Sequence, residues 1–227
     1  ISAYTRYGKS WSVGIGVNMF LLLNTNKRVL INAPKYEQSE IIGNWIAEFM
    51  LKSPIMINSL DIDVKGIERM KKEISKRRKT FKNGNELRIM TAHGEGIGLM
   101  GFGGDLIIDD EDGLIDPEVY RQKITRMKGD SPDSRIIHIG NPWNRDGQMY
   151  EAWISPNTEK LHIPWQVGVQ EGRINKDFIE EQRAILTEME FTILYDANFP
   201  EESEDQLIKF SWIQKAINKE FRDAIID

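Results

Sequence analysis

The chain has 227 residues, of which 40% are hydrophobic and 29% charged, with 30 basic and 35 acidic side chains and no cysteine. This composition is typical of a soluble globular domain, and the lack of cysteine excludes disulfides and thiolate metal sites. The sequence shows no signal peptide and no apolar run that could span a bilayer, so we expect no contact with a membrane.

Hydrophobic periodicity predicts helices and strands that alternate along most of the chain. In chain order, we predict a helix over 9–23, a strand over 28–33, a helix over 36–52, an irregular stretch over 53–64, a basic helix over 65–79, a hairpin over 80–92, a strand over 105–109, a helix over 117–128, strands over 135–142 and 160–165, and helices over 175–189 and 211–222. The alternation predicts an α/β fold with a mostly parallel central sheet flanked by helices.

The glycine-rich stretch GEGIGLMGFGG, over 94–104, resembles a dinucleotide-binding fingerprint in composition. That fingerprint links a strand to a helix, whereas this stretch precedes the predicted strand over 105–109. We therefore interpret it as a flexible loop.

The stretch AYTRYGKS near the start of the chain contains Gly8-Lys9-Ser10, the centre of a phosphate-binding loop. The full motif has a glycine where this chain has Ala3. Backbone amides at the start of the helix would hold phosphate oxygens, Lys9 would reach the β- and γ-phosphates, and Ser10 would bind Mg²⁺. By itself the short motif is equally compatible with a helix that begins beside an exposed lysine.

The run LIIDDED predicts a buried strand that ends in four acidic residues. Adjacent carboxylates repel one another, and a divalent cation with a phosphate ligand would give them a purpose. Asp110 then suits the Mg²⁺ site and Glu111 suits the general base. The alternatives are a register in which Asp109 takes the metal role, and a simple acidic turn.

The run RIIHIGNP predicts the next strand and ends at Asn141, whose carboxamide would lie beside the tip of the preceding strand. There it could orient water or contact the γ-phosphate. Asn-Pro is also common turn chemistry, and spacing alone does not separate the two interpretations.

Residues 65–82 hold nine basic and two acidic side chains, which leaves 21 basic and 33 acidic residues in the rest of the chain. The segment is either a solvated helix face or a contact with a nucleic-acid backbone. For the second interpretation the candidate residues are Lys76, Arg77, Arg78 and Lys79.

Five stretches in this order resemble the ATPase domain of tailed-phage terminase large subunits, the motors that package DNA. They are TRYGKS, VLINAPKYEQSE, DLIIDDEDGLI, RIIHIGNPWNRDGQMY and YDANFPEESEDQLIKFSWIQKAI. The resemblance implies a P-loop NTPase of the RecA-like (ASCE) class, with ATP and Mg²⁺ as cofactors. It also implies a core domain over 1–200, without its first strand and adenine-binding segment. A linker and C-terminal helix over 201–227 would lead to an absent nuclease domain, so we expect no nuclease activity.

By resemblance, Asp110 is the Walker B aspartate, Glu111 the catalytic glutamate and Asn141 the coupling residue. Lys9 is counted with the catalytic residues, and so is Arg6, which could meet the γ-phosphate as an arginine finger does. In many relatives that arginine lies one residue earlier, where this chain has Thr5. The expected nucleotide-binding residues are Thr5, Arg6, Tyr7, Gly8, Lys9, Ser10 and Trp11.

The implied function is ATP hydrolysis that drives double-stranded DNA into a viral procapsid, in the cytoplasm of the host. The implied partners are the DNA, a portal protein, the small terminase subunit and further copies of the chain in a ring. The alternatives are a helicase-like or other P-loop ATPase that acts on nucleic acid, and a non-catalytic nucleotide-binding module.

Overall fold

The computed structural model describes residues 1–62, 71–72, 74, 77–92, 103–122 and 124–201. Three sequence predictions lie wholly or mostly outside these ranges. They are the basic helix over 65–79, the glycine-rich loop over 94–104 and the helix over 211–222.

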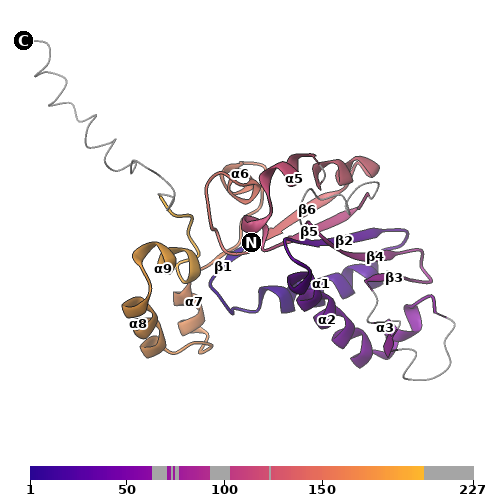
Figure 1. The fold of residues 1–227 in the computed structure, drawn as a ribbon. Helices are drawn as coiled ribbons and strands as arrows, with labels where there is room; N and C mark the ends of the chain where they lie inside the picture. The colour runs from indigo at the N-terminus through magenta and orange to yellow at the C-terminus, as the bar shows by residue number, and fades with distance from the viewer. Residues whose placement is uncertain (63–70, 73, 75–76, 93–102, 123, 202–227) are drawn as a thin grey trace, which may run out of the picture.

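A five-stranded sheet with the order β3-β4-β2-β5-β6 forms the centre of the molecule (Figure 1). Its strands are β2 (Arg28–Ala33), β3 (Arg78–Thr80), β4 (Glu86–Thr91), β5 (Leu106–Asp110) and β6 (Arg135–Ile139). β4, β2, β5 and β6 pair in parallel, and only β3 runs antiparallel to its neighbour among the described strands of this sheet. The prediction of a mostly parallel sheet is confirmed.

A second, two-stranded sheet extends the first at the β6 edge. β1 (Ser2–Ala3) pairs in parallel with β7 (His162–Ile163), and Ser2 forms a parallel bridge to Gly140, just after β6. β1 leads into the loop at Gly8. The carboxyl ends of β1, β5 and β6 therefore face the same edge of the molecule, where ligands bind in open α/β sheets.

Helices cover both faces of the central sheet (Figure 1). α1 (Lys9–Leu23) and α2 (Tyr36–Lys52) pack on one face, and α5 (Pro117–Gln122) and the 3₁₀ helix η3 (Ile124–Asp130) pack on the other. The central strand β2 serves both cores, because Val29 and Ile31 face the first pair and Leu30 faces the second.

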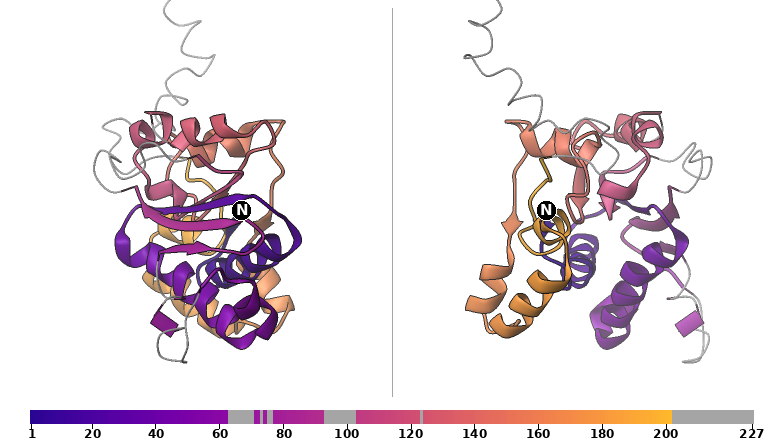
Figure 2. Two further views of the ribbon diagram at one scale, coloured as in Figure 1. Left: turned by 90° about the vertical axis from the view of Figure 1, so that its right-hand side faces the viewer. Right: turned by 60° about the vertical axis from the view of Figure 1, so that its left-hand side comes forward.

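Three short helices form a lobe beside β1 (Figure 2). They are α7 (Trp165–Gln170), α8 (Lys176–Ile185) and α9 (Glu188–Leu194). The lobe has its own small core, centred on Ile179, Phe191 and Tyr195. It follows α6 (Gln148–Ile154) and β7 in the chain. No helix in the described ranges is long and apolar enough to cross a bilayer.

The helices over 9–23 and 36–52 and the strand over 28–33 are confirmed at both ends. The single helix over 175–189 is wrong: it divides into α8 and α9, because Thr187 begins a new helix with a capping box to Glu190. The helix over 117–128 ends as α5 at Gln122, and the 3₁₀ helix η3 follows it.

The stretch over 53–64 is not irregular throughout, as we predicted. It contains α3 (Pro54–Ser59), which Ser53 caps by accepting a hydrogen bond from the Met56 amide. The end of the predicted basic helix is also wrong, because Arg78–Thr80 form β3 and pair with β4 around the predicted Asn83-Gly84 turn.

Asn85 fastens this turn to the end of α1. Its Nδ2 donates to the carbonyls of Leu21 (2.7 Å) and Asn24 (2.8 Å), and its Oδ1 accepts from the Lys27 amide at 2.7 Å. The side chain is 1% exposed, so these backbone groups have little access to water as an alternative partner.

We predict that Asn85→Ala lowers the free energy of unfolding by about 2 kcal/mol, because it leaves the Lys27 amide without its acceptor and leaves the Leu21 and Asn24 carbonyls with Asn83 Nδ2 as their remaining side-chain donor. Urea denaturation monitored by circular dichroism measures the change. Asn58→Ala, at an exposed asparagine, is the matched control and should change the value by less than about 0.5 kcal/mol. Equal effects of the two substitutions would contradict the role of Asn85.

Candidate active site

The loop from β1 to α1 turns through two residues with left-handed backbones, Arg6 (φ 62°) and Gly8 (φ 101°). Glycine adopts this conformation without strain. The first hydrogen bond of α1 runs from the Ser12 amide to the Gly8 carbonyl at 2.9 Å. The amides at the very start of α1 therefore have no partner within the helix, as an anion site at a helix N-terminus requires.

Lys9 joins this loop to the end of β6. Its Nζ donates to the carbonyls of Ala3 (2.9 Å) and Tyr4 (3.4 Å) and to Oδ1 of Asn141 (3.1 Å). Burial lowers the pKa of Lys9, while the carboxylates of Glu111 and Asp110 act in the opposite direction. The ammonium group thus lies within reach of the acidic end of β5.

Asp110 is the last residue of β5 and is 3% exposed. Its Oδ1 is buried and has no hydrogen bond to any described residue. Burial, with a smaller contribution from the charge of Glu111, raises the pKa of Asp110 to about 7, and Lys9 opposes that rise. A buried carboxylate oxygen without a donor is available as a ligand for a cation.

Glu111 begins the turn after β5 and has a left-handed backbone, with φ 49°. For a residue other than glycine this conformation costs about 1–3 kcal/mol, and such strain clusters at functional sites. Gly140 packs against the turn so closely that a Cβ there would lie 3.1 Å from the Glu111 Cα. The 3₁₀ helix η2 (Asp112–Leu114) follows.

Asn141 connects Lys9 to the lobe. Its Oδ1 accepts from Lys9, and its Nδ2 donates to the Ile193 carbonyl in α9 at 3.2 Å. The Asn141 side chain is 5% exposed. A side chain between the loop and the lobe can respond to movement of either one.

The lobe also contacts the loop directly. The Thr5 amide donates to the Leu194 carbonyl at 2.7 Å. The Arg173 guanidinium lies 4.9 Å from the centre of the Tyr7 ring and donates to the Tyr7 carbonyl at 3.3 Å. No pattern in the sequence predicted these contacts, because the Arg173 and Tyr7 positions are 166 residues apart.

Tyr4 packs against the lobe at Gly168. The Tyr4 side chain is 2% exposed, and a Cβ on Gly168 would lie 2.2 Å from its hydroxyl oxygen. The absence of a side chain at position 168 is therefore what allows α7 to approach the loop this closely.

The structure brings most of the predicted site residues together at one edge of the sheet. Lys9 donates a hydrogen bond to Asn141 and interacts electrostatically with Asp110 and Glu111. Ser10 follows Lys9 in the first turn of α1. Arg6 is exposed, and its positive charge opposes the rise that burial causes in the pKa of Tyr195 in the lobe. Trp11 is 45% exposed and stacks edge-on against Phe49 of α2, with ring centres 5.7 Å apart.

The predicted DNA contacts lie elsewhere. Lys76 is outside the described residues, and Arg77, Arg78 and Lys79 lie at or next to β3, at the opposite edge of the sheet from β6. Lys79 is 4% exposed, so as it stands it cannot reach a DNA backbone. Arg78 is exposed and pairs with Glu86, with Nε 2.7 Å from Oε1.

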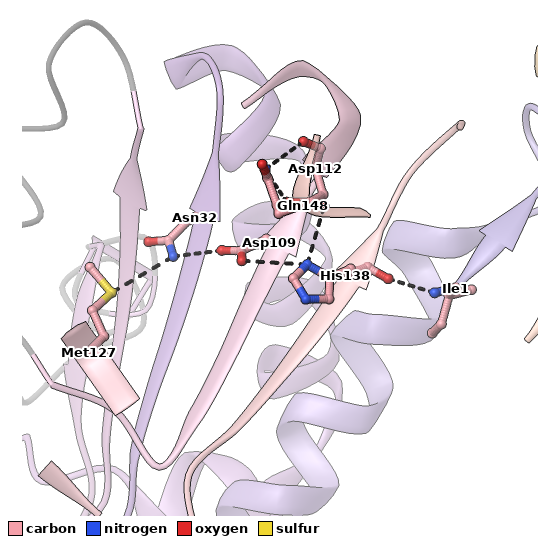
Figure 3. Close-up of polar contacts among 7 residues, drawn as sticks. All are labelled: Ile1, Asn32, Asp109, Asp112, Met127, His138 and Gln148. Carbon is pink, nitrogen blue, oxygen red and sulfur yellow. Dashed lines mark hydrogen bonds and ion pairs between the residues drawn. The ribbon is translucent and has the colours of Figure 1, made fainter. Parts of the chain in front are cut away.

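A buried polar network lies on the other face of β5 (Figure 3). Asn32 donates to Asp109 at 2.8 Å, and Gln148 donates to Asp112 at 2.8 Å. His138 lies between the two aspartates. The sequence offered one sign of this network: Asp109 and His138 are polar residues in two predicted strands that are otherwise apolar, and the structure pairs them directly.

No protein-family profile and no curated protein matches the chain. Among solved structures, it is similar to the large terminase ATPase domain of Thermus phage P74-26, in an Arg-to-Ala mutant form (TM-score 0.69, 20% identity, covering 87% of this chain and 86% of that one). It is also similar to the large terminase of bacteriophage HK97 (TM-score 0.65, 18% identity, covering 88% and 46%).

A third similar structure is the large terminase of a thermophilic bacteriophage in complex with ADP (TM-score 0.64, 13% identity, covering 88% and 48%). The chain therefore spans about half the length of the HK97 and thermophilic-phage proteins and most of the P74-26 domain. These similarities show that the chain has the fold of the ATPase domain of phage large terminases.

We predict that Asp110→Asn stabilises the chain more at pH 8 than at pH 5 when divalent cations are removed with EDTA. The folded-state pKa of Asp110, about 7, lies above its ordinary value of 3.8. The free-energy cost of ionising Asp110 in the folded chain therefore grows as the pH rises from about 4 to about 7, and it stays constant at higher pH. Urea midpoints measured across this pH range test the prediction. A stability difference that does not change with pH would contradict it.

Proposed function

We propose that this chain hydrolyses ATP with Mg²⁺ and uses the energy to move double-stranded viral DNA into a procapsid, as the ATPase domain of a terminase large subunit. The observation that carries the proposal is the convergence of Lys9, Asp110, Glu111 and Asn141 at one sheet edge, on this fold. The large terminase of the thermophilic bacteriophage, which shares the fold, has been solved with ADP and with ATP-γ-S.

The residues at this edge suit a magnesium nucleotide. Oδ1 of Asp110 is buried without a donor, and the Ser10 hydroxyl belongs to the first turn of α1. Asp110 and Ser10 would hold Mg²⁺, which neutralises charge on the β- and γ-phosphates when bound. The backbone of the loop from Thr5 to Trp11 would surround the phosphates, and its amides other than that of Thr5, which donates to the Leu194 carbonyl, would hold the phosphate oxygens.

Lys9 would exchange partners when nucleotide binds. Its ammonium group now donates to neutral carbonyl and amide oxygens, and phosphate oxygens are stronger acceptors because they are charged. Movement of Lys9 toward phosphate would withdraw the donor from Asn141, which also holds the Ile193 carbonyl. This gives Asn141 a physical means to couple the nucleotide to the lobe.

Glu111 would take the proton from the attacking water. It stands directly after Asp110, and its strained backbone is supported by the close packing of Gly140. Arg6, exposed on the loop, is the residue of the loop that would meet charge developing on the γ-phosphate. A portal protein, a small terminase subunit and a ring of copies are the partners that a packaging motor would need.

We predict that Glu111→Gln lowers the turnover of ATP by about 10²–10⁴-fold while nucleotide affinity stays within a few-fold, because only proton transfer is lost. Steady-state phosphate release and binding of a fluorescent ATP analogue measure the two quantities. Glu118→Gln, at an exposed glutamate of α5, should leave both unchanged. Hydrolysis by Glu111→Gln at the parent rate would overturn the assignment.

We also predict that Arg77→Ala with Arg78→Ala weakens binding to duplex DNA and lowers the slope of log affinity against log salt by about 0.9 for each phosphate contact removed. Fluorescence anisotropy at several salt concentrations measures the slope. Arg126→Ala, on the exposed side of η3, is the matched control. Salt-independent binding, or equal slopes in the double variant and the parent, would count against this surface.

A further inference from the structure

Two carboxylates and an imidazole, from Asp109, Asp112 and His138, meet beside β5 and could bind a metal ion (Figure 3). His138 Nδ1 lies 3.2 Å from Asp112 Oδ2 and 4.0 Å from Asp109 Oδ2. Asp109 shares its face with Ile107 and the core around α5 and η3, whereas Asp110 points to the other side because residues alternate along a strand. The cluster is thus separate from the candidate active site.

The atoms that face one another in this cluster lie at ion-pair distance from one another but form no hydrogen bond to a described residue. Asp109 Oδ2, Asp112 Oδ2 and His138 Nδ1 are each buried, and none of them has a hydrogen bond to a described residue. The side chains of Asp109 and Asp112 are fully buried. Gln148, which is 4% exposed and contacts Asp112, also has a buried Oε1 without a partner among the described residues.

The second oxygen of each carboxylate is held by an amide. Asn32 Nδ2 donates to Asp109 Oδ1, and Gln148 Nε2 donates to Asp112 Oδ1, both at 2.8 Å. This arrangement orients one oxygen of each aspartate and leaves the other for a further ligand, as the outer shell of a metal site does. A divalent cation bound between the two carboxylates would balance the charges of both.

We propose that Asp109, Asp112 and His138 form a binding site for a divalent transition-metal cation of the Zn²⁺ class. Zn²⁺ binds imidazole nitrogen and carboxylate oxygen at about 2.0–2.2 Å, which sets neighbouring ligands roughly 3.3 Å apart in a tetrahedral site. The 3.2 Å separation is close to this value, whereas the 4.0 Å separation is longer and the three ligand atoms lie within 4.8 Å of one another, so the side chains would draw closer together on binding. Mg²⁺ is disfavoured because it prefers oxygen ligands alone.

The site has a structural consequence for the neighbouring turn. Asp109 and Asp112 are on either side of Asp110 and Glu111 in the chain. A cation bound by both would hold the two ends of the strained turn at Glu111 from the opposite face of the sheet. The inference does not depend on ATP hydrolysis, and its test does not measure hydrolysis.

The test is to strip the purified chain with a chelator, dialyse it, and titrate Zn²⁺ against a chromophoric chelator. We expect about one tightly bound Zn²⁺ per chain, a rise in the melting temperature, and visible absorption bands when Co²⁺ replaces Zn²⁺. Absence of bound Zn²⁺ in the folded wild-type chain would overturn the proposal.

Variants locate the bound metal. Asp112→Asn and His138→Gln should each weaken Zn²⁺ binding by more than about tenfold, and Gln148→Leu should weaken it by about tenfold through the outer shell. The matched controls are Asp146→Asn and His162→Gln, at exposed positions. Circular dichroism confirms that each variant is folded. Full binding by both ligand variants would overturn the site, and so would equal losses in the controls.

Discussion

The parallel pairing of β5 with β6 is the constraint on which the rest of the polar architecture depends. Its register sets Asp109 beside His138 and Asp110 beside Ile139. Because successive residues of a strand point to opposite faces, the side chains of Asp109 and Asp110 lie on opposite faces of the sheet. A shift of one residue would exchange them and would send Asp109 toward Lys9. The same pairing brings Gly140 against the turn at Glu111.

The lobe depends on the same strand ends. Asn141 leaves β6 at the point where it can reach both Lys9 and the α9 backbone, and β1 passes between β6 and β7. The loop at Gly8 is therefore enclosed on one side by the sheet and on the other by helices far along the chain. The acceptors of the buried ammonium group of Lys9 come from the sheet side, from the Ala3 and Tyr4 carbonyls and from Oδ1 of Asn141.

Local sequence was sufficient for the elements with strong periodicity. The helix over 9–23 and the strand over 28–33 have the predicted bounds because one apolar pattern runs through each without interruption. The helix over 175–189 was wrong because apolar spacing continues across Leu186, while the capping chemistry of Thr187 starts a new helix. β3 was missed because a basic run also suits an exposed edge strand, which charge helps to protect.

The candidate site was predictable where its residues follow strand ends, as Asp110, Glu111 and Asn141 do. Their grouping required only a parallel sheet with β5 next to β6. The partners of Tyr7 and Thr5 in the lobe were not predictable, since no pattern in the sequence connects β1 to α7 and α9. The burial of Lys79 was not predictable either. An edge strand has one covered face, and the sequence does not show which of its side chains point to that face.

The contact between Tyr4 and Gly168 limits how the lobe can move. An aromatic hydroxyl occupies the space that a methyl group on α7 would need, so the two surfaces are already at their closest approach. The lobe can rotate about this point or separate from it, but it cannot slide inward. A shorter distance between α9 and the loop must therefore arise from tilting of the lobe about the Tyr4 ring and not from an inward slide of α7.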